Sequence, residues 1–104
     1  MSRMHSRARD KLELAVRALA IGQGDVRSRL KVAYKHLRRL SARNMPVQAH
    51  CELEGILNEL TKHGPDVKFE LTAIEHTMRR IRNKTGRALA IRIYELRTML
   101  DNIS

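Results

Sequence analysis

The sequence has little of what most functional signatures require. In 104 residues it contains no tryptophan, three other aromatic residues, two prolines and one cysteine. A lone cysteine excludes an intrachain disulfide, which favours an intracellular, reducing environment. Charged residues interrupt the stretch that follows the basic N-terminus, and no apolar run approaches the ~20 residues of a membrane span. We therefore expect no signal peptide, no membrane partner and a cytoplasmic location.

The residues that are present favour helices, because leucine, alanine, arginine and glutamate are abundant while glycine and proline are few. Apolar side chains recur every three or four residues in five segments, which end near Gly22, Leu40, Gly64, Arg82 and Leu100. We expect caps at Asp25, Asp66 and Thr85, and Pro46 in the first turn of the third helix. The alternation over residues 67–71 resembles a strand, but it is too short and isolated to outweigh the helical period.

The fold class that follows is all-α, a single compact bundle of four to five short amphipathic helices with short connections. The domain spans residues 1–104, of which 1–5 are expected to be disordered. The helix count depends on whether residues 83–86 break the last helix or only kink it. We expect a helix content well above the ~30–35% of an average domain, with no sheet. The side chains expected to converge on one core are Leu30, Leu37, Leu53, Leu57, Ile74, Met78, Leu89, Ile93 and Leu96.

Positive charge is concentrated at the two ends of the chain. Residues 1–43 have a net charge of +9, residues 44–76 of −4, and residues 77–104 of +5. In the second helix Asp25 is the only acid, although opposite charges four residues apart would stabilise an ordinary exposed helix. A second group of five cations lies within residues 79–87. The residues that we expect to bind nucleic acid are Arg27, Lys31, Lys35, Arg38, Arg39, Arg79, Arg80, Arg82, Lys84 and Arg87.

Crowded cations of this kind favour a polyanionic ligand, since each neutralised phosphate releases counterions. We expect a small non-catalytic accessory or regulatory protein that binds duplex nucleic acid or structured RNA, because single-strand recognition usually stacks bases on exposed aromatic rings. The alternative is a protein-interaction module that places its cationic face on an acidic protein partner. Self-association into a homodimer is a further alternative. The simplest competing interpretation is that the cations bind no partner. They would then be solvated, or would pair with Glu52, Glu54 and Glu59 of the third helix.

Candidate chemistry is sparse. Arg29 and His36 lie seven residues apart, and this spacing resembles the Arg-x6-His signature of HEPN-type helical ribonucleases, which would imply metal-independent cleavage of RNA at a dimer interface. The resemblance covers eight residues, and Leu30 stands where the pattern favours a polar residue. A helix-turn-helix with its turn at Gly24 fits only in part, and a plain helical hairpin is the alternative.

The histidines and the cysteine do not add a site to this pattern. Their spacing matches no zinc signature, and Cys51 has no base beside it on the same helix face. We therefore expect no metal, no cofactor and no catalytic residue.

Overall fold

Five helices make up most of the chain, as the apolar periodicity predicted. The computed structural model describes residues 6–41, 43 and 45–103, so the expectation for residues 1–5 lies outside the described residues. The helices are α1 (Ser6–Ile21), α2 (Val26–Leu37), α3 (Val47–Leu60), α4 (Ala73–Arg80) and α5 (Asn83–Ile103). They account for 74% of the described residues, against the ~30–35% of an average domain. The all-α prediction is confirmed.

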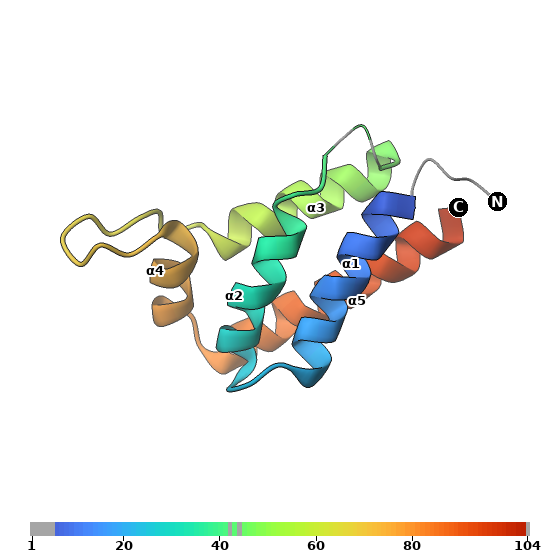
Figure 1. Cartoon of the computed structure of the whole chain (residues 1–104). Helices are drawn as coiled ribbons and strands as arrows, with labels where there is room; N and C mark the ends of the chain where they lie inside the picture. Colours follow the sequence, from blue (N-terminus) through green and yellow to red (C-terminus); the bar gives the residue numbers. More distant parts are fainter. Residues whose placement is uncertain (1–5, 42, 44, 104) are drawn as a thin grey trace.

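The first two helices form an antiparallel hairpin (Figure 1) rather than a helix-turn-helix unit. Gly24 makes the turn with a φ of 81°, a value that side chains disfavour. Asp25 caps α2 as predicted, its carboxylate accepting a hydrogen bond from the Ser28 amide. The helix ends at Leu37, earlier than the apolar pattern suggested, because a tighter turn then brings Leu40 into the core.

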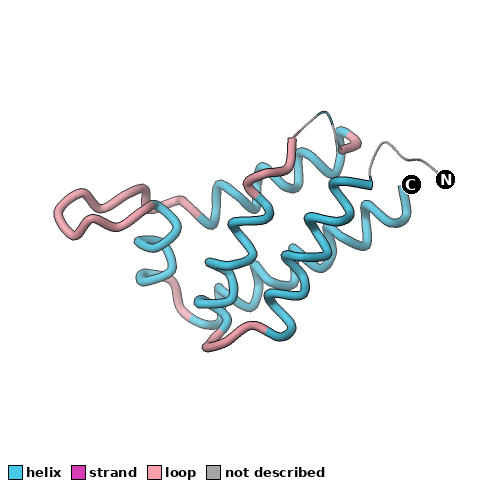
Figure 2. Tube along the Cα trace, in the orientation of Figure 1, coloured by secondary structure: helices cyan, strands magenta, loops and turns pink. Residues whose placement is uncertain are grey.

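The segment between α3 and α4 departs from the sequence prediction. Asp66 does not cap a helix; its backbone exchanges two hydrogen bonds, of 3.0 and 2.9 Å, with that of Leu71. This isolated bridge closes a turn that projects from the body of the molecule (Figure 2). The helix begins only after Thr72, which accepts a hydrogen bond from the Glu75 amide while the Glu75 side chain accepts one from the Thr72 amide. Because α4 begins at this reciprocal cap rather than after Asp66, it is only eight residues long.

The junction of α4 and α5 also lies elsewhere than predicted. The chain leaves the helical conformation at Ile81, whose ψ is 156°, and α5 already begins at Asn83. Thr85 is therefore inside α5 rather than at its cap, and Gly86 does not break the helix. A Cβ on Gly86 would lie 2.9 Å from Val26 Cγ1, so glycine allows α5 to approach α2 closely. The count of five helices is correct, although the break precedes the predicted one.

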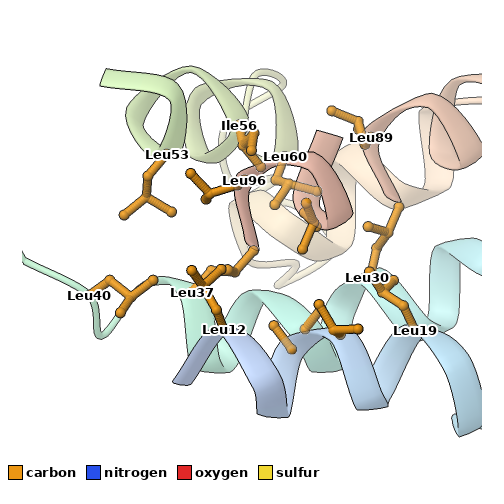
Figure 3. Packing of buried hydrophobic residues seen from close by; sticks show 14 of the residues in the cluster. Leu12, Leu19, Leu30, Leu37, Leu40, Leu53, Ile56, Leu60, Leu89 and Leu96 are labelled. Carbon is orange, nitrogen blue, oxygen red and sulfur yellow. The ribbon is translucent and has the colours of Figure 1, made fainter. Parts of the chain in front are cut away.

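The core lies where α5 packs against α1, α2 and α3, and α4 lies beside α2 on the side away from α1 (Figure 1). Leucines of α1, α2, α3 and α5 point toward one another (Figure 3). Of the predicted core residues, Leu57 and Ile74 are only partly buried at its margin; the others are buried. None of the described helices is both long and apolar enough to cross a bilayer.

Candidate nucleic-acid interface

The ten cations expected to bind nucleic acid lie on neighbouring elements. They are distributed over α2 and the turn after it (Arg27, Lys31, Lys35, Arg38, Arg39), over α4 (Arg79, Arg80), at the α4–α5 junction (Arg82) and in the first turns of α5 (Lys84, Arg87). Because α4 packs beside α2, some cations of both groups lie at the boundary between these helices. Arg27, Lys31 and Arg79 line one cavity of about 480 Å³. Asp25 and Glu75 line the same cavity, so its charge is mixed.

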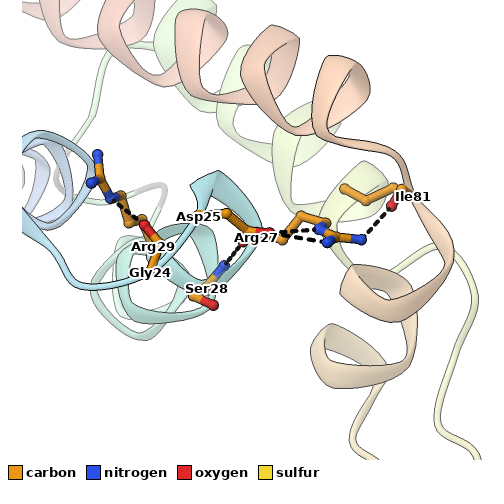
Figure 4. Close-up of polar contacts among 6 residues, drawn as sticks. All are labelled: Gly24, Asp25, Arg27, Ser28, Arg29 and Ile81. Atoms are coloured by element: carbon orange, nitrogen blue, oxygen red, sulfur yellow. Dashed lines mark hydrogen bonds and ion pairs between the residues drawn. The ribbon is translucent and has the colours of Figure 1, made fainter.

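Arg27 differs from the other nine because its guanidinium is already bound within the protein (Figure 4). Its Nε and Nη2 donate to Asp25 Oδ2 at 3.3 and 3.0 Å, and Nη1 donates to the carbonyl oxygen of Ile81 at 3.3 Å. The hydrogen bond from Arg27, followed by that from the Ser28 amide, lowers the pKa of Asp25 below its ordinary value. Arg27 thus ties the start of α2 to the α4–α5 junction and has a structural role.

The other nine side chains are exposed and, within the described part of the chain, form no ion pair. The acids of α3 do not neutralise them. Glu52 pairs with Arg92 at 3.1 Å, Glu54 with His50 at 3.4 Å and Glu59 with Lys62 at 3.4 Å. The interpretation in which α3 pairs with the basic face of α2 is therefore wrong.

The positive charge of this region also affects the pKa of a neighbouring histidine, His63. Desolvation lowers the pKa of His63 first, and the positive charge of Arg80, then that of Lys62 and His76, lowers it further. The His63 ring lies 5.9 Å from that of His76, measured between centroids. His63 thus experiences the uncompensated charge at the end of α4.

A second and larger cavity, of about 740 Å³, lies between α2 and the N-terminal turn of α4. Lys31, Lys35 and Arg38 border it, and its apolar lining includes Val32 and Ile74. We call this cavity the α2–α4 groove. Sequence reasoning missed it, although Val32 is an apolar residue among the cations of α2 and could have indicated it. Val32 is 44% exposed where it lines the groove.

Arg29, one of the two residues behind the ribonuclease hypothesis, has its guanidinium engaged within the protein. Arg29 Nε donates to the Gly24 carbonyl oxygen and Nη1 to that of Leu19, both at 3.1 Å. These bonds close the α1–α2 turn and engage two of the three guanidinium nitrogens. Arg29 would have to leave this turn to act on RNA, so these contacts disfavour the ribonuclease hypothesis.

The remaining chemical candidates are isolated. Cys51 is exposed on α3. His76 Nδ1 lies 2.9 Å from the Gly64 carbonyl oxygen, which fixes its ring within the loop after α3. Among the residues that the structure describes, no three His, Cys, Asp or Glu side chains are placed to share a metal ion.

Comparisons of the chain with protein-family models, with curated proteins and with solved structures find no match.

Proposed function

We propose that this protein binds nucleic acid as a small, non-catalytic accessory or regulatory factor, through the exposed cations of α2, α4 and the α4–α5 junction. One observation carries the proposal: nine exposed cations on adjoining elements have no ion-pair partner among the described residues, whereas the α3 acids are paired elsewhere. We refer to these nine side chains, the predicted set without Arg27, as the basic surface.

Electrostatics favour a phosphate ligand for the basic surface. Like charges at neighbouring positions repel one another, so their grouping reduces the stability of the free protein. A polyanion converts this cost into binding, because each neutralised phosphate releases condensed counterions. With a net charge of +10 on 104 residues, long-range attraction also speeds the encounter with a polyanion.

Fluorescence anisotropy at low salt, with labelled duplex DNA, single-stranded DNA and an RNA hairpin, tests the proposal directly. The double variant Lys31→Glu/Lys35→Glu is expected to bind more weakly and to flatten the salt dependence by about one unit for each lost phosphate contact. The same is expected of Arg79→Glu/Arg80→Glu. Arg7→Glu/Arg17→Glu is the matched control, because it changes the net charge equally at exposed positions of α1, on the other side of α2 from α4.

The comparison with the control decides whether the location of the charge matters. The proposal requires both basic-surface variants to lose more affinity than the α1 control. It fails if the parent binds no nucleic acid at low salt, or if all three double variants bind equally.

An acidic protein partner is the second candidate. The apolar lining of the α2–α4 groove favours it, because an acidic segment could insert an aliphatic side chain between the cations. Pull-down from lysate, with and without nuclease treatment, separates the two candidates. If the nuclease-treated parent still captures the same acidic protein and Lys31→Glu/Lys35→Glu does not, the partner is a protein rather than nucleic acid.

A further inference from the structure

The α2–α4 groove has features that a simple phosphate-binding surface does not require. Beside its cations it has an apolar lining, provided by residues such as Val32 and Ile74. It also contains a carboxylate, Glu75, which would repel a phosphate placed directly against it. A ligand that fits all three features must have negative groups at the rim, an apolar body and a hydrogen-bond donor.

Glu75 is held in place as an acceptor. Its Oε1 accepts hydrogen bonds from the Thr72 amide and the Thr72 hydroxyl, each at 2.9 Å. These two bonds are the main reason that its pKa lies below the ordinary value, and the charges of Lys31 and Arg79 lower it further. Glu75 is therefore ionised at neutral pH. Because both bonds use Oε1, the second carboxylate oxygen is the one suited to accept from a ligand.

We infer that the α2–α4 groove binds an unpaired nucleotide within a nucleic-acid strand. The base lies against the apolar lining, its exocyclic amino group donates to Glu75, and the adjoining phosphates contact Lys31, Lys35 and Arg38. Carboxylates accept hydrogen bonds from base amino groups, as in their recognition of cytosine N4. This inference rests on the proposed function and specifies its ligand. It also revises the sequence-based expectation of a duplex, because a paired base cannot enter a groove in this way.

The dimensions of the groove suit a nucleotide that belongs to a strand. Its volume of about 740 Å³ is within the ~300–1,000 Å³ of typical ligand sites. Lys31 and Arg38 are two turns apart, about 10 Å along the helix axis, so the cations can contact successive phosphates. Tyr34 also lines the groove, where its ring is partly buried against the core.

The test measures by fluorescence anisotropy how tightly labelled ten-nucleotide oligocytidine, oligouridine and an RNA duplex bind. Free cytidine monophosphate is measured as a competitor of labelled oligocytidine. The parent is expected to bind oligocytidine about tenfold more tightly than oligouridine, because uracil has no amino group for Glu75. Glu75→Gln keeps a side chain able to complete the cap of α4, and it is expected to remove most of this preference.

Val32→Asp places a charge in the groove, and it is expected to weaken oligocytidine binding by about tenfold and duplex binding by less, because only the unpaired base enters the groove. Leu14→Asp is the matched control, because Leu14 is 48% exposed on α1 and undergoes the same change of charge. It should leave the preference for cytidine intact. Circular dichroism of each variant establishes that the helices are retained.

The outcomes separate this inference from the proposed function. If duplex and single strands bind, but oligocytidine and oligouridine bind equally or Val32→Asp matches Leu14→Asp, the nucleotide site is wrong and nucleic-acid binding stands. If no nucleic acid binds, both fail. Free cytidine monophosphate binding as tightly as the oligonucleotide would overturn the assignment to a strand. Retention of an acidic protein by nuclease-treated parent, lost in Val32→Asp, would assign the groove to a protein instead.

Discussion

At the scale of single residues, the arginines at the start of α2 show that identical side chains have different roles. Arg27 and Arg29 carry the same charge as the other cations of this helix, yet each donates hydrogen bonds to backbone carbonyl oxygens of other segments. The sequence pattern cannot separate them from Arg38, whose side chain is exposed and unpaired within the described residues. Their partners come from the α1–α2 turn and the α4–α5 junction, whose positions are known only in the folded chain.

The burial of Leu37 supports a prediction at the same scale. Leu37 is fully buried in the core, so Leu37→Ala is expected to lower the free energy of unfolding by about 2–5 kcal/mol. Urea denaturation followed by circular dichroism measures this change. Val32→Ala, on the same helix but 44% exposed, is the control and should cost less than about 1 kcal/mol. A loss below about 0.5 kcal/mol for Leu37→Ala would mean that α2 presents another face to the core.

At the scale of elements, α4 depends on its first turn. A helix of eight residues is too short to be stable alone, so its reciprocal Thr72–Glu75 cap and its contact with α2 maintain it. Thr72→Ala removes the hydroxyl that accepts from the Glu75 amide. We expect it to cost about 0.5–2 kcal/mol of unfolding free energy, measured by urea denaturation. Thr98→Ala, at an exposed site within α5, should cost less; equal losses would show that the cap is not important.

The ionisation of Glu75 gives α4 a pH dependence. Since the pKa of Glu75 is lower in the folded than in the unfolded state, the unfolded chain binds more protons as the pH falls. The stabilisation is complete above the unfolded pKa and is lost as the pH falls through the folded pKa. Urea midpoints at about pH 3 and about pH 6 should therefore differ more in the parent than in Glu75→Gln. An equal acid loss in both proteins would contradict this role.

At the scale of the whole molecule, two glycines within helices differ in how closely a neighbouring element packs against them. A Cβ on Gly55 of α3 would lie 3.0 Å from Arg92 Nη2, the end of a flexible side chain. A Cβ on Gly86 of α5 would lie 2.9 Å from Val26 Cγ1, in a stiff side chain of α2. The close crossing of α5 over α2 thus depends on Gly86.

The two glycine-to-alanine changes test this crossing. Gly55→Ala is expected to stabilise the protein by about 0.5–1 kcal/mol, because alanine is the better helix former and Arg92 can move. Gly86→Ala has the same propensity gain but must displace α2 or α5, so we expect no net gain or a loss. Thermal denaturation of the two variants measures the difference. Equal stabilisation by both would show that α5 and α2 are not closely packed at Gly86.

The sequence by itself determined the all-α class, a count of four to five helices, the first three helices to within a few residues, most of the core and the unequal distribution of charge. These features are local: a period of three to four residues and a cap such as Asp25 act within a few turns of chain. The start of α4 is also local, because the Thr72–Glu75 cap acts within one turn, but the prediction placed the cap at Asp66 instead. The tertiary structure decided that Gly86 lies inside α5 rather than at a break, because its close approach to Val26 is a contact between helices. It also decided which cations are unpaired and created the α2–α4 groove, since both depend on which side chains the packing of separate helices brings together.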